Sequence, residues 1–450
     1  MVNKASYLIL SISSGLSQFS SLSIMYFFKD ELNTNPSQLS VINSIVLFPL
    51  IIKPLFGLLS DLYPLFGYRR KVYIILCGII DSLSWIAMTL ISHTIFSASF
   101  CLFISTSCVS FTSALGEAIA VQLNNGQHPK EENNNSTNII KVFIFRSIGM
   151  LISSILRAIV VQYFTYTTVF LIASILPLLT IVSGVIYKED SIFNHSSYRY
   201  LINISSSHIQ RKDGQEVISF KNFLLKIKTK EILYPLLFVV LFTATPGYMD
   251  SSFYYLTEYK GFTPASIGLM TIFLTIVIII NLIIYNVYLT RISITNIIPW
   301  SLVLSFFFSS LFNIWILFDW KNQLIVFIAI SFHMALKMLS LMPIMNLACL
   351  VCPKGYEGSV YSLFTSSANI GRTISGLLGS VMMVIFGIRK DNYNNFNIMV
   401  FIINIITLLP ILVLLLIPSQ YLEPPEGKEK TGNEVKIEMD TYTPNETNSN

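Results

Sequence analysis

Charged residues are scarce in this sequence. Asp, Glu, Lys and Arg make up only 12% of its 450 residues, whereas they make up roughly 25% of a soluble globular protein. Many of these few charges also cluster in two segments, residues 188–230 and 419–450. The rest of the chain is too apolar to form a surface that faces water. The composition therefore excludes a soluble enzyme, a nucleic-acid-binding protein and a disordered regulator as descriptions of the whole chain, and it predicts an integral membrane protein.

Cysteine and histidine are also rare, with five residues of each. The cysteines lie in or beside apolar segments, and the closely spaced pair Cys349 and Cys352 has no second pair that would complete a zinc site. We therefore predict that the cysteines are packing residues and that the protein holds neither a metal nor a cofactor.

The sequence lacks the patterns expected of two other classes of membrane protein. No Gly-x-x-x-x-Gly-Lys-Ser/Thr motif is present, which disfavours a self-contained ATP-driven pump. An intramembrane enzyme, such as a lipid or acyl transferase, would need a His, Ser or metal constellation at membrane depth. Only His333 among the scattered histidines lies well within an apolar segment, so we expect no enzymatic activity.

What the sequence has in abundance is long apolar segments, and 53% of its residues are apolar. A membrane-spanning helix needs about 20 mostly apolar residues, and these runs are too long and unbroken for the alternating strands of a barrel. The pattern predicts an all-α membrane protein with twelve transmembrane helices. Their expected ranges are 5–28, 39–59, 72–92, 98–121, 139–161, 166–187, 232–256, 265–289, 295–317, 323–348, 357–386 and 396–417.

The loops between these segments differ in their content of basic residues. If the N-terminus is cytoplasmic, most loop Lys and Arg residues are on the inner side, and the outer loops hold Lys29, Lys260, Lys321, Arg389 and Lys390. Because Lys and Arg are retained on the cytoplasmic side during insertion, both termini are predicted to be cytoplasmic. No clear address motif appears, so the plasma membrane is the expected location, with an organelle membrane as the alternative.

Residues 188–230 are polar and rich in Ser, Asn and Lys, and they leave six apolar segments on each side. Such a stretch is typical of an inter-domain linker. We therefore predict an N-terminal six-helix bundle over residues 1–187, a cytoplasmic linker over 188–230 and a C-terminal six-helix bundle over 231–418. The tail over 419–450 is predicted to be disordered and cytoplasmic.

A short internal repeat supports this division. The segment Arg146–Ser154 in the fifth predicted helix aligns without gaps with Arg372–Ser380 in the eleventh, at an offset of 226 residues. The fifth and eleventh helices are equivalent in two six-helix halves. The match therefore favours the parallel repeats of a major facilitator transporter.

Four charged residues lie near the middle of predicted helices, namely Glu117, Arg146, Lys337 and Arg372. A charged side chain inside a bilayer costs at least about 2.5 to 3.5 kcal/mol, so each one needs a partner or a water-filled cavity. We expect all four to face a central cavity between the halves and to bind substrate. A purely structural ion pair is the alternative.

Three further charges have simpler explanations. Arg157 lies near the outer end of its helix, where its long side chain can reach the membrane surface. Asp81 and Lys53 are expected to be structural partners near helix ends.

Prolines interrupt two predicted helices. Pro246-Gly247 lies in the seventh and Pro343 in the tenth, and the backbone groups freed by such a break need protein or cavity water as partners. Tyr248 and Asp250 lie beside the first break, in a group of aromatic residues that could clamp a flat aromatic solute. An ordinary proline kink with tyrosines at the membrane interface is the alternative.

The end of the second predicted helix and the loop after it contain Gly57, Asp61, Gly67, Arg69 and Arg70. These residues resemble the signature of major facilitator transporters. In that signature the glycine allows close helix approach, the aspartate caps or pairs at a helix end, and the basic pair anchors the loop inside. Here the spacing from Asp61 to the next glycine is longer than in the general signature.

The stretched form, with Lys53-Pro54 ahead of it, resembles the version found in the folate-biopterin transporter family. Thr245-Pro246 matches another short feature of that family. A more specific resemblance follows Pro343 in a run that contains Cys352, Pro353, Lys354, Gly355, Glu357 and Gly358. The resemblance implies structural or conformational roles for these motif residues.

The resemblance also implies a secondary active transporter that moves folate, a pterin or a related aromatic organic anion by alternating access. Glu117 or Asp250 could pair with the pterin ring, and Arg146, Arg372 or Lys337 with the glutamate tail. Import of a dianion into a cell held negative costs about 4.6 kcal/mol per 100 mV. Two co-transported protons would cancel this cost, and Glu117 is the expected proton carrier.

One departure from the family keeps a rival interpretation open. Family members tend to carry several acids on the fourth helix, whereas Glu117 stands alone here, with Ser113 and Gln122 where further acids are expected. The alternative is a major facilitator carrier or transceptor for a different small solute, because a fold alone does not fix the substrate.

Under either interpretation, the expected partners are a small-molecule substrate, protons and the lipid bilayer.

Overall fold

The computed structural model describes residues 2–125, 135–189, 230–351 and 357–414. Within these ranges the regular elements are α-helices, short π and 3₁₀ turns and two isolated β-bridges. The all-α prediction is therefore confirmed.

The helices that precede residue 190 are α1 (Val2–Leu16), α2 (Ser21–Tyr26), α3 (Pro36–Val46), α4 (Phe48–Ile51), α5 (Lys53–Leu62), α6 (Lys71–Ile91), α7 (Ile95–Asn125), α8 (Asn135–Tyr163), α9 (Tyr166–Ala173) and α10 (Leu178–Ile186). The helices that follow residue 229 are α13 (Lys230–Thr243), α14 (Met249–Tyr254), α15 (Pro264–Tyr288), α16 (Ile294–Leu317), α17 (Gln323–Val351), α18 (Glu357–Ile385), α19 (Phe396–Ile406) and α20 (Pro410–Val413). We call these two groups the N-terminal half and the C-terminal half.

Ten helical segments in the described ranges are long and apolar enough to cross a membrane. Two shorter apolar helices, Ile232–Thr243 and Phe396–Leu412, occupy the seventh and twelfth predicted segments. Apolar helices therefore occur in all twelve predicted segments, ten of them at spanning length. The chain is an integral, multi-pass membrane protein.

The seventh segment is short because a break separates α13 from α14. Pro246 lies in this break and cannot donate a backbone hydrogen bond. Two neighbouring groups are satisfied by α18: the Gly247 N–H donates to the Ser375 carbonyl at 3.2 Å, and Ser375 Oγ donates to the Thr245 carbonyl at 2.6 Å. The predicted interruption at Pro246 is confirmed, whereas Pro343 lies inside the continuous helix α17, so the interruption predicted there is wrong.

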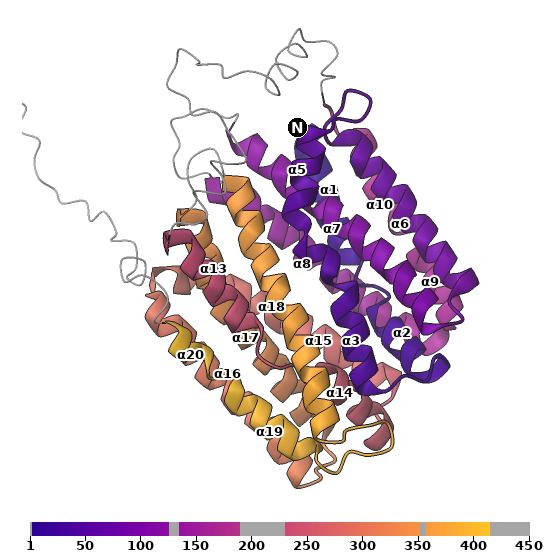
Figure 1. Ribbon diagram of the computed structural model, residues 1–450, viewed down its shortest axis with the longest axis vertical. Helices are drawn as coiled ribbons and strands as arrows, with labels where there is room; N and C mark the ends of the chain where they lie inside the picture. The colour runs from indigo at the N-terminus through magenta and orange to yellow at the C-terminus, as the bar shows by residue number, and fades with distance from the viewer. Residues whose placement is uncertain (1, 126–134, 190–229, 352–356, 415–450) are drawn as a thin grey trace, which may run out of the picture.

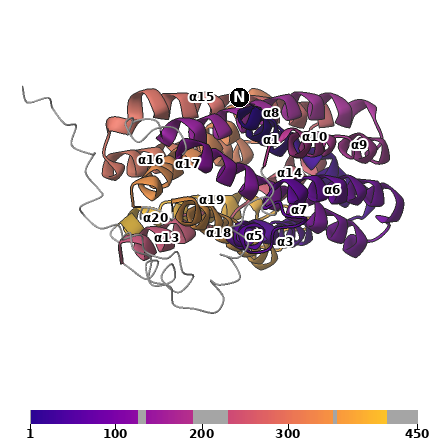
Figure 2. The same cartoon turned by 90° about the horizontal axis from the view of Figure 1, so that it is seen from above.

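The two halves lie side by side. In Figure 1 the N-terminal half, in indigo and purple, lies to one side of the C-terminal half, which runs from magenta to yellow, and Figure 2 shows the same division from above. The halves meet where α3 packs on α18 and where α8 packs on α15. Small residues lie at both contacts: Ser40 Oγ donates to the Gly376 carbonyl at 2.9 Å, and Gly268 faces Ala158. Such residues let membrane helices approach closely.

Each half repeats the same corner. The π-helical turns after α2 and α14, Phe27–Glu31 and Tyr255–Tyr259, are followed by Asn33 and Gly261, whose φ angles are 50° and 68°. The next helix then begins at a proline in both halves.

The helices that carry the sequence repeat also occupy equivalent places. Helix α8 packs against α1 and α15, and α18 packs against α13 and α3. Each therefore contacts the first predicted membrane segment of its own half and the second predicted segment of the other. These relationships support parallel repeats. The predicted boundaries at 1–187, 188–230, 231–418 and 419–450 stay a prediction, because the linker and the tail lie almost entirely outside the described residues.

Candidate functional site

Three charged side chains meet inside the N-terminal half. Glu117 on α7 accepts hydrogen bonds from Lys53 Nζ at 2.7 Å and from Arg146 Nη2 at 3.0 Å, both at the same carboxylate oxygen. Lys53 begins α5 and Arg146 lies on α8, so this oxygen joins three helices. Ser113, one turn before Glu117, accepts from the same Arg146 nitrogen at 3.0 Å. We call Lys53, Glu117 and Arg146 the three-charge cluster.

The three-charge cluster holds two cations and one carboxylate. Its side chains are largely withdrawn from solvent, with exposed fractions of 5% for Lys53, 14% for Glu117 and 24% for Arg146. Charges at membrane depth are costly without partners. Ser11 and Ser14 line a crevice that reaches Glu117 and Arg146 and has no room for a water molecule in this conformation. Two cations around one carboxylate oxygen are suited to attract a small anion when the crevice opens.

Two further cations lie in the C-terminal half. Lys337 Nζ on α17 donates to Thr245 Oγ1 at 3.1 Å, and Arg372 Nη1 on α18 donates to Asn369 Oδ1 at 3.1 Å. In the part of the chain that the structure describes, no carboxylate lies within 4.0 Å of either cation. Asn369 also donates to the Leu50 carbonyl at 3.2 Å, so this face of α18 is directed towards the N-terminal half.

Tyr248 and Asp250 are engaged elsewhere in this conformation. Tyr248 is buried, its hydroxyl lies 2.7 Å from Ser309 Oγ, and its ring stacks on Phe312 with centroids 6.2 Å apart. Asp250 accepts a hydrogen bond at 3.0 Å from Asn43 of the other half. The structure therefore places Tyr248 in packing within the C-terminal half and Asp250 in the contact between the halves.

The sequence matches a known family over nearly its whole length. The model of the BT1 family matches residues 14–437. The chain belongs to the BT1 family. Curated relatives of this BT1 protein include "Folate transporter 1" of Plasmodium falciparum, 28% identical over 431 residues that cover 93% of this chain and 80% of the relative. Another is "Folate-biopterin transporter" of Synechocystis, 26% identical over 436 residues that cover 93% and 82%. The family resemblance predicted from the motifs is confirmed.

Solved structures show the same fold. The nucleoside transporter NupG matches with a TM-score of 0.66 at 13% identity, covering 92% of this chain and 99% of that one. The peptide-transporter relative PepTSo matches with a TM-score of 0.67 at 12% identity, covering 93% and 98%. The fold is therefore of the major facilitator type, as predicted. The family match and the curated relatives, which are named as folate and folate-biopterin transporters, support the prediction of a small-molecule transporter rather than an enzyme.

The loop between α5 and α6 explains part of the family signature. Gly67 has a φ of 81°, in the left-handed region that favours glycine. The backbone N–H groups of Arg69, Arg70 and Lys71 donate to the Glu189 carboxylate at 3.0, 3.1 and 2.9 Å. An acid at a helix N-terminus satisfies N–H groups that lack helical partners and favours the helix dipole. Glu189 could not be predicted as the partner of this loop, because it lies more than a hundred residues away along the chain.

Other motif residues carry less information here. A Cβ atom at Gly57 would have nothing within 4 Å, so the expected close helix approach at this glycine is wrong in this conformation. The side chain of Asp61 and the run from Cys352 to Gly355, which includes Pro353 and Lys354, lie outside the described residues. Glu357 and Gly358 begin α18, and the Glu357 side chain also lies outside the description.

Asp81 and Lys53 are not partners, which corrects the sequence prediction. Lys53 belongs to the three-charge cluster, and Asp81 accepts a hydrogen bond from Ser105 Oγ at 2.6 Å. Asp81 also lies at the centre of α6 rather than near its end. Arg157 donates to the Gln18 carbonyl at 3.3 Å, so it binds protein. The sequence does not indicate which helix faces meet, and so it could not assign the partners of these residues.

Proposed function

We propose that this BT1 protein moves folate, a pterin or a related aromatic organic anion across a membrane by alternating access. The observation that carries the proposal is the set of cations at membrane depth. Lys53 and Arg146 share one carboxylate oxygen of Glu117, and Lys337 and Arg372 have no carboxylate partner in the described ranges. Curated relatives named for folate and folate-biopterin transport support this substrate class.

The proposed roles follow from the chemistry of each group. Arg146 and Arg372 offer planar, two-pronged donors to a carboxylate, and Lys337 offers a point charge. Glu117 or Asp250 is suited to accept from the amide edge and amino group of a pterin ring, and Asp250 keeps this role when Glu117 carries a proton. The sequence predicts two further substrate-binding residues, Tyr248 and Asp250. In this conformation they form hydrogen bonds with Ser309 and Asn43, respectively. They would join the site only after the halves separate.

Proton coupling is part of the proposal. Glu117 now has two cationic partners. When a substrate carboxylate draws Arg146 away, Glu117 loses a counter-ion, and a carboxylate at membrane depth with less compensation favours its neutral, protonated form. The proton would then offset one negative charge of the substrate. Each charge moved against 100 mV costs about 2.3 kcal/mol.

We propose that both termini lie in the cytoplasm, because the predicted loops are asymmetric in Lys and Arg. The plasma membrane stays the expected location, with an organelle membrane as the alternative. In this scheme the bundles over 1–187 and 231–418 rock about the substrate site, and residues 188–230 link them. Small residues at the α3–α18 and α8–α15 contacts suit such a movement, since their side chains form few interlocking contacts.

Purified protein in proteoliposomes tests the proposal. With an acidic outside, labelled folate should accumulate, and pterins should compete with it better than para-aminobenzoate or unrelated anions. R146Q and R372Q should each raise KM about 10- to 100-fold, since a charged hydrogen bond contributes about 1.5 to 3 kcal/mol. R389Q, in a loop outside the spans, is the matched control and should leave KM unchanged. If neither folate nor a pterin is transported or competes, the substrate assignment is wrong.

A further inference from the structure

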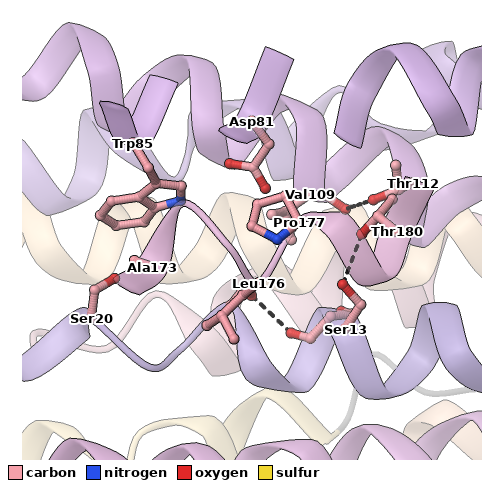
Figure 3. Close-up of a pocket in the computed structure, with 12 residues that line it drawn as sticks. Ser13, Ser20, Asp81, Trp85, Val109, Thr112, Ala173, Leu176, Pro177 and Thr180 are labelled. Carbon is pink, nitrogen blue, oxygen red and sulfur yellow. Dashed lines mark hydrogen bonds between the residues drawn. The ribbon is translucent and has the colours of Figure 1, made fainter. Parts of the chain in front are cut away.

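A second polar pocket lies within the N-terminal half, among α1, α6, α7 and the junction of α9 with α10. Its volume is about 20 Å³, which is room for one water molecule. Figure 3 shows the carboxylate of Asp81 directed into it, between Trp85 and Pro177. The remaining polar lining consists of hydroxyl side chains, those of Ser13, Ser14, Ser17, Ser20, Thr112 and Thr180.

Asp81 is a buried acid without a counter-ion. It is 7% exposed and lies at the centre of α6. Ser105 donates to it at 2.6 Å, and the indole nitrogen of Trp85 faces the same carboxylate. Among the described residues no Lys or Arg lies within 4.0 Å of it.

The other helices around Asp81 add no charge. Its titratable neighbour is Cys77, one turn earlier on α6, and Cys77 in turn contacts Cys108 on α7. The pocket-lining side chains from α1, α9 and α10 are hydroxyl or apolar. A carboxyl group in such surroundings is stable only when it is protonated and neutral, or when a cation binds to its charged form.

This pocket borders the candidate substrate site. Ser14 on α1 lines both the Asp81 pocket and the narrow pocket that reaches Glu117 and Arg146. Thr112 and Ser113, which are consecutive on α7, line one pocket each. A change at the Asp81 pocket can therefore reach Glu117 and Arg146 through Ser14 and the adjacent residues of α7.

We propose that Asp81 binds a second proton of the transport cycle, separate from the proton at Glu117. The proton enters from water on one side of the membrane and leaves to water on the other, with the Asp81 carboxylate alternately neutral and charged. Ser105 and Trp85 donate to the carboxylate and stabilise its charged form, whereas burial without a counter-ion stabilises the neutral form, so both states are accessible to Asp81. One proton at Asp81 and one at Glu117 together offset the two negative charges of a dianionic substrate. The inference rests on the proposed function.

Proteoliposomes loaded with a pH-sensitive dye test this inference with labelled folate. The wild type should take up about two protons per folate, and D81N about one. D81N should also accumulate less folate under a pH gradient, yet still exchange labelled for unlabelled folate, because exchange requires no net proton movement. D81E, which keeps a titratable carboxyl, should retain about two. A purely structural role of Asp81 would instead impair exchange.

An infrared measurement tests the site without any substrate. At neutral pH the purified wild type should show the carbonyl stretch of a protonated carboxylic acid, and D81N should lack that band. The inference is overturned if the band is the same in both proteins, or if D81N moves as many protons per folate as the wild type. Accumulation that requires Na⁺ in the wild type but not in D81N would also overturn it, by assigning the pocket to Na⁺. Absence of any folate or pterin transport by the wild type would instead count against the proposed function.

Discussion

Glu258 and Lys29 form an ion pair that joins the two halves, with 3.2 Å between the carboxylate oxygen and Lys29 Nζ. Lys390 lies 3.8 Å from the same oxygen and donates to Asn33 Oδ1 at 2.8 Å. Lys29 and Glu258 lie in the two π-helical turns, and Lys390 lies in the loop after α18. These segments meet at one end of the molecule. The structure is therefore held closed at this end, which the distribution of basic residues predicts to be the outer end.

Removing the charge of Glu258 should loosen this closed end. Thr34 is fully buried there, where the Tyr254 hydroxyl donates to its carbonyl at 2.8 Å. We expect E258Q in a T34C background to raise the rate of labelling by a membrane-impermeant maleimide about 3- to 10-fold, because each partly exposed pair contributes about 0.2 to 1 kcal/mol. E31Q, at an exposed acid of the same end, is the matched control. An unchanged rate in E258Q would show that the pairs do not hold the end closed.

The helices of this protein could be predicted from its sequence because each one is a long apolar segment. Whether Pro246 and Pro343 interrupt their helices could not be predicted from the sequence, because one proline breaks its helix and the other does not. The break at Pro246 is supported by Ser375 on a distant helix, whereas α17 continues through Pro343. The presence or absence of such a partner depends on tertiary packing.

The candidate site could also be predicted only in part from the sequence. The depth of Glu117 and Arg146 in their segments indicated a shared environment, and the structure pairs them. Lys53 was assigned the wrong partner because it follows a helix break at Ile52, which changes the face that it presents. Asp81 lies too far along α6 for an end-of-helix pair.

The contact between α1 and α8 predicts a strong effect of a single methyl group. A Cβ atom at Gly149 would overlap the carbonyl oxygen of Ile12, and one at Gly15 would overlap that of Arg146. We expect G149A to lower the free energy of unfolding by about 1 to 3 kcal/mol, as overpacking does, and to lower the melting temperature in detergent. G57A is the matched control, because nothing lies within 4 Å of its added methyl group. Equal melting temperatures for the two variants would contradict the close approach.

Glu189 predicts a graded effect on the start of α6. It accepts from three consecutive backbone N–H groups, so E189A should lower the free energy of unfolding by about 1 to 2 kcal/mol. E189Q keeps an acceptor oxygen but loses the charge, and should have a smaller effect. Thermal unfolding in detergent distinguishes the two variants. If E189A melts with the wild type, the loop does not depend on this cap.

The three-charge cluster predicts that two substitutions do not add. E117Q leaves the cations of Lys53 and Arg146 beside each other with no carboxylate between them, and removal of one partner of a buried ion pair costs about 3 to 5 kcal/mol. K53M in the same chain removes one of these cations, while Ser113 still accepts from Arg146. The double variant K53M/E117Q should therefore melt at a higher temperature than E117Q alone.

The size of this recovery in stability shows whether Lys53 and Glu117 are coupled. Residues in direct contact show coupling energies of about 0.5 to 3 kcal/mol, whereas distant sites add within about 0.5 kcal/mol. K337M is the matched control, because Lys337 binds Thr245 in the other half and its loss should add to that of E117Q without coupling. Since Lys53 and Arg146 contact the same oxygen of Glu117, the recovery must also be smaller when Arg146 is already neutral. A recovery of equal size in an R146Q background would mean that Lys53 and Arg146 act on Glu117 independently, and that the cluster is not a single electrostatic unit.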